Sequence, residues 1–375
     1  MKRQRGVALI TVLLVVAIVT VVCAGLIVRQ QLAIRASSNQ AQARQALHYA
    51  LGGEALAQGI LLRDLQAAGS APGEGVDHPL EAWARPLPTF PIDAGEISVR
   101  IEDLSGRFNL NSLVQGGAGG QPGGEADGGQ PPGPATSNNE AVEQFQRLLL
   151  NLGIAQPAYA ERLVDWLDRQ PERAGENGAE DNDYLLAEPP YRTGDRRLED
   201  VSELRLLLGM TEADYRLLLP HVSVLPADAP LNVNTAGAMV LSSLPGLTPG
   251  AAQALVQGRP AEGYRDTDPF KAALGQQVGP GAATPGGGGL NPDNGLDGGN
   301  GLGDPDGTTS EINLAVSSQY FQVISEVRLA DRRQVLVSTL QRQATSRTGE
   351  PGSVRVLQRN FGQSARVAPS APPQG

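Results

Sequence analysis

Residues 7 to 28 read VALITVLLVVAIVTVVCAGLIV, a run of apolar and small side chains that contains no charge. A helix of this length, at about 1.5 Å per residue, spans the roughly 30 Å hydrocarbon core of a bilayer. Lys2, Arg3 and Arg5 precede the run, so the positive-inside rule predicts a cytoplasmic N-terminus and an exported body. The chain is therefore expected to be anchored in a membrane by a single helix.

A cleaved secretory signal peptide is the alternative for the same run, since small residues occur between Val22 and Gly25. The run is longer than the roughly 7 to 15 apolar residues of a signal peptide, however, and no proline follows it until Pro72. The pattern favours one long helix, embedded in the membrane first and amphipathic afterwards. The only cysteine, Cys23, lies inside the run, so no intramolecular disulfide can form and packing is its expected role.

Composition narrows the functions open to the exported part. The chain has 46 glycines and 28 prolines among 375 residues, which predicts ordered modules joined by flexible segments. Its 40 acidic and 30 basic side chains give a net charge of −10, which disfavours phosphate backbones and anionic lipid surfaces. Nucleic acid is therefore not an expected partner.

Sequence patterns divide the chain into ordered and flexible parts. Residues 97–103 alternate as a half-buried strand does, 139–259 have helical spacing, and 320–358 predict a hairpin and a third strand. Two tracts rich in Gly are too polar to order themselves. The expected parts are a leader (1–6), a transmembrane helix (7–28), an amphipathic stem with first strands (29–114), a linker (115–138), an all-α domain (139–274), a Gly/Asp-rich loop (275–310), C-terminal strands (311–362) and a disordered tail (363–375).

Strand signals on both sides of the helical block predict an α+β fold. The simplest arrangement is a long N-terminal helix packed on an antiparallel sheet, with the large all-α domain inserted between the strands of that sheet. Within the helical block, separate helices are expected near 142–152, 159–168, 201–208 and 213–219.

Several motifs resemble the type IV pilin-like superfamily. Arg5-Gly6 directly before an uncharged helix is similar to a leader that a prepilin peptidase cuts after the glycine, which implies cleavage between Gly6 and Val7 and N-methylation of Val7. Most members carry Glu at the fifth mature position, where this chain has Thr11. The large insertion and six phrases further resemble the minor pseudopilin K family of type II secretion systems, over nearly the whole length. The phrases are GRFNLN (106–111), LVDWLD (163–168), GAEDNDY (178–184), PPYR (189–192), VSELR (201–205) and LNVNTA (231–236).

The resemblance implies a role in assembly rather than catalysis. A carboxylate buried in an apolar stem is tolerable only when paired, and in such filaments its partner is the terminal amine of the adjacent subunit. A subunit with Thr11 there cannot neutralise a neighbour's amine, so it suits the end of a filament. The implied role is to cap the tip of a periplasmic pseudopilus and help start its assembly for export across the outer membrane. The implied partners are the other minor pseudopilins, the prepilin peptidase and the inner membrane.

Two acidic groups are candidate calcium sites. Carboxylates on loops that contain Gly suit Ca²⁺, and the resemblance implies calcium in the globular domain. Residues 293–298 partly resemble an EF-hand loop, although Gly295 replaces a ligand and a solvated acidic loop is the plainer alternative. One candidate set is Asp293, Asp297, Asp304, Asp306 and Glu311, and the other is Asp168, Glu180, Asp181 and Asp183, with Asp165 beside it.

A helix-hairpin-helix is the basis of an alternative function, a membrane-anchored extracytoplasmic DNA-uptake receptor. Residues 244–259 read LPGLTPGAAQALVQGR and resemble this unit, which in DNA-binding proteins offers hairpin amides to a phosphate. Thr248 stands where a second glycine is usual, and Arg259 is the only basic residue between Leu231 and Gly263. Because DNA binding depends on Lys and Arg, a helical packing unit is favoured.

An anchored periplasmic metal-dependent enzyme is a second alternative, and the sequence gives it little support. No GxSxG or HExxH motif occurs, and His48, His78 and His221 are scattered along the chain. Asp165 and Asp168 are about one helical turn apart and could act as acid and base, but flanking an apolar face is the commoner role of such residues. The chain is not expected to be an enzyme.

Overall fold

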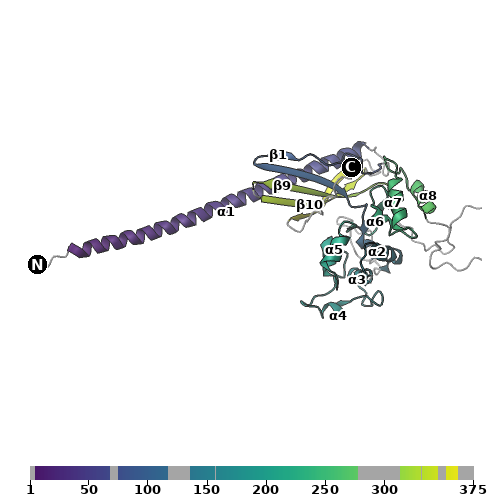
Figure 1. Ribbon diagram of the computed structural model, residues 1–375, viewed down its shortest axis with the longest axis horizontal. Coiled ribbons are helices and arrows are strands. Elements are labelled where there is room, and N and C mark those ends of the chain that lie inside the picture. Colours follow the sequence, from purple (N-terminus) through teal and green to yellow (C-terminus); the bar gives the residue numbers. More distant parts are fainter. Residues whose placement is uncertain are drawn as a thin grey trace, which may run out of the picture.

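A computed structural model describes residues 5–67, 75–116, 136–156, 158–277, 313–330, 332–344 and 352–361. The first element, α1 (Arg5–Ala67), is one unbroken helix of 63 residues, about 95 Å long at 1.5 Å per residue. In Figure 1 it runs from the free N-terminus to the folded body. Its large apolar side chains from Leu9 to Ile34 are each more than half exposed, whereas those of Ala50 and Leu61 are fully buried. The predicted long helix is confirmed.

The body begins with a five-stranded antiparallel sheet in the order β1-β2-β9-β10-β11. The predicted hairpin is confirmed, with Leu329 paired to Arg332 and Ala330 at a φ of 54° in the turn. β2 pairs with β9 although the whole helical region separates them in sequence, so the predicted fold class is confirmed. The strands are β1 (Phe90–Ile92), β2 (Gly95–Asp103), β9 (Tyr320–Leu329), β10 (Arg332–Gln343) and β11 (Ser353–Phe361).

The second half of α1 packs closely on this sheet. A Cβ at Gly53 would lie 2.6 Å from Ser325 Oγ, so only glycine allows the helix this close. The buried Glu54 carboxylate accepts hydrogen bonds from Ser338 Oγ at 2.5 Å and from Arg359 Nη2 at 2.7 Å, which ties α1 to β10 and β11. Burial alone would raise the pKa of Glu54, but the hydrogen bonds from Arg359 and Ser338 outweigh it and lower that pKa.

The region between β2 and β9 is mainly helical and has two cores. Phe145, Tyr159 and Leu163 are fully buried in one core, and Phe270 and Leu241 are fully buried in the other. Side-chain caps from Asn138 and Thr211 begin two of the helices. The helices are α2 (Asn139–Asn151), α3 (Ala158–Leu167), α4 (Asp181–Tyr184), α5 (Glu212–Leu218), α6 (Ala238–Leu241), α7 (Pro249–Gln257) and α8 (Thr267–Gln277), and η1 (Leu110–Leu113) and η2 (Val201–Leu206) are 3₁₀ helices.

Short pairs of strands connect the helical region to the rest of the body through backbone hydrogen bonds. β3 (Phe108–Asn109) pairs in parallel with β6 (Val222–Ser223), and β7 (Leu231–Asn232) pairs in parallel with β8 (Leu314–Ala315). β4 (Val114–Gln115) pairs with β5 (Thr136–Ser137) at the two ends of the predicted linker.

Two details differ from the sequence prediction. The helix expected at 201–208 is a 3₁₀ helix that ends at Leu206, because Leu207 has an extended backbone and its amide turns back to Leu204. The first segment of the predicted C-terminal strands, β8, pairs with β7 and not with the sheet. Most of both Gly-rich tracts and the predicted tail lie outside the described residues, so the proposed domain boundaries stay a prediction.

Candidate functional site

The first half of α1 is a long exposed apolar surface. From Leu9 onward the helix is long and apolar enough to cross a membrane, with a mean hydropathy of 3.0 in its most apolar window and none of that window buried. Gly6 and Val7 lie in its first turn, and Thr11 is exposed about one turn further on. A bare apolar rod of this kind needs lipid or other helices to cover it.

The first predicted calcium set lies outside the described residues. All of its members fall between residues 278 and 312, so the set stays a prediction. These residues are Asp293, Asp297, Asp304, Asp306 and Glu311.

The second set falls in a described acidic cluster where α3 ends and α4 begins. Asp165 is 0% exposed, and its Oδ1 accepts the Ala174 amide at 2.7 Å. Its Oδ2 and the Glu180 Oε1 are buried without a hydrogen-bond partner. A Cβ at Gly178 would lie 2.3 Å from Asp165 Oδ2, so only glycine lets this carboxylate pack so close to the backbone. Unpartnered buried carboxylate oxygens call for a cation.

Raised pKa values of Glu180 and Asp168 also indicate that this cluster holds uncompensated negative charge. Burial, followed by the charges of Asp165 and Asp168, raises the pKa of Glu180 to about 7. Burial also raises the pKa of Asp168 to about 6, and the charges of Asp165 and Asp195 act in the same direction. Among the described residues, none of Asp165, Asp168 and Glu180 has a salt bridge. The cluster therefore holds negative charge that protons or a bound cation must neutralise.

Asp181 and Asp183, which the prediction grouped with Asp168 and Glu180, are bound to arginines instead. Asp181 pairs with Arg192 at 2.6 Å, and Asp183 receives two hydrogen bonds from Arg173 at 2.5 and 2.7 Å. The structure thus brings Asp168 and Glu180 together with Asp165, and it gives the other two members a different role.

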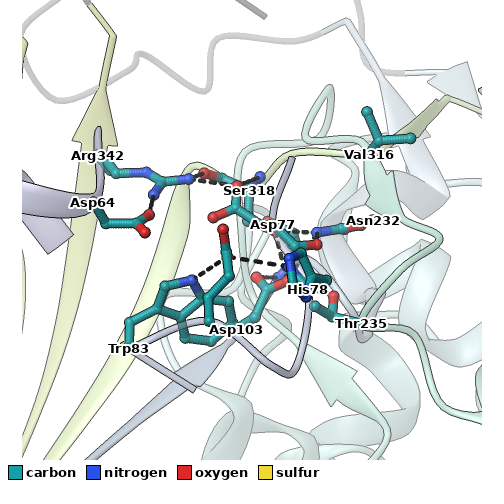
Figure 2. A network of polar contacts seen from close by, with 12 residues as sticks. Asp64, Asp77, His78, Trp83, Asp103, Asn232, Thr235, Val316, Ser318 and Arg342 are labelled. Carbon is teal, nitrogen blue, oxygen red and sulfur yellow. Dashed lines mark hydrogen bonds and ion pairs between the residues drawn. The ribbon is translucent and has the colours of Figure 1, made fainter. Parts of the chain in front are cut away.

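A second acidic cluster, which the sequence did not reveal, joins α1 to the sheet and to the segment before β1 (Figure 2). One carboxylate oxygen from each of Asp64, Asp77 and Glu81 lies within 4.8 Å of the other two. The Arg342 guanidinium, 6% exposed, donates to Asp64 Oδ2 at 2.7 Å, to Asp77 Oδ2 and to the Ser318 carbonyl at 2.9 Å. The Arg342 guanidinium therefore supplies the positive charge of this cluster. We call Asp64, Asp77, Glu81 and Arg342 the junction cluster. Among the described residues, the carboxylate oxygens of Asp165, Asp168 and Glu180 do not all lie within 4.8 Å of one another.

Polar contacts extend the junction cluster to the helical region. Ser318 donates its amide to Asp77 Oδ2 at 2.6 Å and its hydroxyl to Asp103 Oδ2 at 2.6 Å. Asn232 donates to Ser318 Oγ at 2.7 Å, and Thr235 donates to Asp103 (Figure 2). Burial raises the pKa of Asp103 to about 6 despite these hydrogen bonds. These hydrogen bonds hold the helical region, through Asn232 and Thr235, against Asp103 at the end of β2 and Ser318 before β9.

The helix-hairpin-helix unit uses its one basic residue internally. Gly246, at a φ of 72°, turns the chain between α6 and α7. The Arg259 guanidinium donates to the backbone carbonyls of Asn234, at 3.1 Å, and Ala236. Burial lowers the pKa of Arg259 to about 10. This cation therefore binds a loop of its own chain, as expected of a helical packing unit.

Comparisons with known proteins show which family the chain resembles. Two family models described as type II secretion system protein K match residues 106–227 and 231–286. Type II secretion system protein K of Pseudomonas aeruginosa is 49% identical over 373 residues, covering 98% of this chain and 96% of the relative. The protein of the same name from Pectobacterium carotovorum is 33% identical over 378 residues, covering 98% and 99%. A chain from the solved GspK-GspI-GspJ complex of enterotoxigenic Escherichia coli matches with a TM-score of 0.65 and 26% identity, covering 87% of this chain and 99% of that one.

Proposed function

The chain belongs to the protein K family of type II secretion systems and is therefore a minor pseudopilin, and we propose that it caps the tip of the periplasmic pseudopilus and helps to start its assembly. The position of the helical region is the observation that supports this proposal. In Figure 1, α2 to α5 lie beside the end of the sheet that is farthest from the N-terminus. A subunit stacked beyond this one would have to share that space, so the helical region disfavours any place below the tip.

Thr11 adds a second argument for the tip. A stem carboxylate at this position would neutralise the terminal amine of the next subunit, and Thr11 has no charge with which to do so. A neighbour stacked beyond this chain would therefore keep an unpaired charge in the apolar stem layer. The end of the filament is the one place where no such neighbour exists.

Labelling of assembled pseudopili tests the position. A gold tag on the exposed Gly250 of α7 should appear at filament ends and not along their sides. Thr11→Glu should admit some labelled subunits below the tip, because the carboxylate can pair with a neighbour's amine. Thr20→Glu, the same change elsewhere in the anchor, is the control and should not do so. Side labelling by the unmodified chain would contradict the tip proposal.

Processing and topology are parts of the same proposal. A prepilin peptidase would cut between Gly6 and Val7 on the cytoplasmic side, leaving residues 7 to 28 in the inner membrane and the body in the periplasm. Mass spectrometry of the chain coexpressed with the peptidase should find residues 1 to 6 missing and Val7 methylated. An intact N-terminus, or a cut near Ala24, would contradict pilin-like processing.

The proposed partners are the other minor pseudopilins of the same secretion system. The solved relative is a GspK-GspI-GspJ complex, which supports proteins of the I and J classes as the partners of this chain. The DNA-uptake receptor gains no support, because the matched relatives are secretion proteins and Arg259 is engaged within its own chain. The family is a structural component of the secretion system and not an enzyme family.

Calcium binding is proposed for the cluster of Asp165, Asp168 and Glu180. Two of its carboxylate oxygens are buried without a partner, so the residues fit a hard cation that prefers oxygen ligands. A bound ion would neutralise the cluster and hold the end of α3 against the start of α4. The Asp293 to Glu311 set remains a second proposed site on the sequence pattern alone.

A further inference from the structure

Three exposed arginines follow the apolar run of α1. Arg29 comes directly after Val28, and Arg35 and Arg44 lie further along the same helix. All three side chains are exposed, and within the described chain none of them forms an ion pair. In Figure 1 the first half of α1 stands clear of the folded body. These cations are therefore free to bind an anion that is not part of the chain.

The chain as a whole is acidic, but the first half of α1 is not. No acidic residue occurs from Met1 to Gly53. The first one, Glu54, is buried and accepts hydrogen bonds from Arg359 at 2.7 and 2.8 Å. The net charge of −10 therefore arises beyond this point, so it disfavours anionic lipid for the body and not for the stem.

Depth in the membrane separates Arg29 and Arg35 from Arg44. At 1.5 Å per residue, Arg29 lies about 1.5 Å beyond the end of the apolar run, Arg35 about 10 Å and Arg44 about 24 Å. The headgroup layer extends about 5 to 7 Å beyond the hydrocarbon core on each side. Helical side chains lean toward the N-terminus, which here is toward the membrane. The long side chain of Arg35 can therefore reach back into the headgroup layer, whereas that of Arg44 cannot.

The residues between the two arginines suit the same layer. Leu32 and Ile34 are 60% and 61% exposed, although both are large and apolar. Apolar side chains that alternate with cations at the end of a membrane span are typical of the boundary between acyl chains and headgroups.

We propose that Arg29 and Arg35 bind the phosphate groups of anionic phospholipids, such as phosphatidylglycerol, at the surface of the membrane from which the body emerges. The inference rests on the proposed membrane anchor and names the lipid class that this anchor selects. A guanidinium suits a phosphate because it is weakly hydrated and can donate two parallel hydrogen bonds. Six residues of helix place the two side chains about 120° apart around the axis, so each contacts a lipid of its own.

Native mass spectrometry of the full chain tests the proposal. The chain is placed in nanodiscs that contain equal amounts of phosphatidylglycerol and phosphatidylcholine, and the lipids that stay bound on its release are counted. Arg29→Gln and Arg35→Gln should each lower the ratio of bound phosphatidylglycerol to phosphatidylcholine about fivefold, the effect of one cation near an anionic surface. Glutamine keeps a similar helix propensity, so α1 should remain intact.

Arg44→Gln is the matched control, because it removes an equally exposed and unpaired arginine of the same helix that lies beyond the headgroups. It should leave the lipid ratio unchanged, and an equal loss in this variant would overturn the proposal. An excess of inorganic phosphate should not displace the lipid. Displacement would identify a free anion as the ligand and would also overturn the lipid assignment.

Alkaline carbonate extraction separates the lipid inference from the proposed anchor. If the chain stays in the membrane but retains both lipids equally, the lipid inference is wrong and the anchor stands. If carbonate releases the chain from the membrane, the anchor itself fails and the lipid inference fails with it.

Photocrosslinking tests the depth directly. The full chain with Leu32→benzoylphenylalanine, irradiated in vesicles of the same two lipids, should join to phospholipid. The same photoreactive residue at Leu56, which is 40% exposed and lies about 36 Å further along α1, is the control and should not. A lipid product at Leu56, or none at Leu32, would overturn the depth on which the assignment rests.

Discussion

The junction cluster and the cluster of Asp165, Asp168 and Glu180, which we call the calcium-candidate cluster, are both groups of largely buried carboxylates. Their negative charge is neutralised differently. In the junction cluster, Arg342 from β10 reaches Asp64 and Asp77, so the protein supplies its own cation. At the calcium-candidate cluster, Asp165 and Glu180 each retain a buried oxygen without a partner. The difference teaches that the nearest acidic residues do not by themselves mark a metal site. Negative charge that the chain leaves uncompensated is the better guide to where a cation is expected.

The largest expected effect comes from removing the internal cation. Arg342→Met should lower the free energy of unfolding of the full chain in detergent by about 3 to 5 kcal/mol, because Asp64 and Asp77 would remain buried without a positive partner. Denaturant unfolding can be followed by tryptophan fluorescence, since Trp83 lies beside the cluster (Figure 2). Arg333→Met removes an exposed pair with Glu326 and should cost at most about 1 kcal/mol. Equal losses in the two variants would break the comparison.

The second effect concerns calcium at the other cluster. Calcium at about a hundred times its dissociation constant should raise the free energy of unfolding by about 2.7 kcal/mol. Asp165→Asn should abolish this increment, measured within each variant by thermal melts with calcium and with a chelator. Asp77→Asn should retain it, although that variant is less stable throughout. An increment that survives Asp165→Asn would remove the cluster from the list of calcium sites.

The third effect is a pH dependence without calcium. The pKa values of Asp168 and Glu180, about 6 and about 7, are raised above their ordinary values of 3.8 and 4.5. The folded chain therefore holds protons that the unfolded chain has lost between about pH 4 and 7, so the free energy of unfolding falls as pH rises, on the order of 2 kcal/mol.

Variants divide this pH dependence between the two clusters. Burial, with the charges of Asp64 and Asp77, also raises the pKa of Glu81 to about 7, so the junction cluster contributes with the same sign. Glu180→Gln should remove the calcium-candidate cluster's share of the fall in the free energy of unfolding with pH. Glu81→Gln should remove the junction cluster's share. Calcium should suppress only the share that depends on Glu180. Stability that rises with pH over this interval in the calcium-free chain would contradict the assignment.

The smallest effect is expected at Asp183, which the sequence had grouped with the calcium ligands. Asp183→Asn loses an exposed pair with Arg173 and should change the free energy of unfolding by no more than about 1 kcal/mol. The calcium increment should remain as in the unmodified chain. Loss of the increment would return Asp183 to the ligand set.

The fold could be predicted largely because its signals are local. The uncharged run after Gly6, the alternation at 97–103 and the hairpin near Ala330 each follow from residues close in sequence. The leucines of 201–208 have helical spacing and predict a helix there, but not that it is a 3₁₀ helix that ends at Leu206, before the extended backbone of Leu207.

The sites were harder to predict because they join distant residues. One signal for the junction cluster was present, since Arg342 continues the buried phase of Leu336, Ser338 and Leu340 along β10. An inward-facing arginine in an alternating strand implies a buried acidic partner. Nothing local says that this partner is Asp64 on α1, nor that Asp181 would turn to Arg192 while Asp165 stays unpaired. Such choices depend on tertiary packing.

The order of strands in the sheet sets when the stem can become rigid. α1 is made first, but it packs on β9, β10 and β11, which are the last strands of the sheet in the described chain. Contacts between such distant segments form slowly, because the loop between them must close first. A chain interrupted before Arg359 would lose one of the two side chains that donate hydrogen bonds to Glu54, together with the end of β11. The stem is therefore expected to become rigid only when the last strands of the sheet are in place.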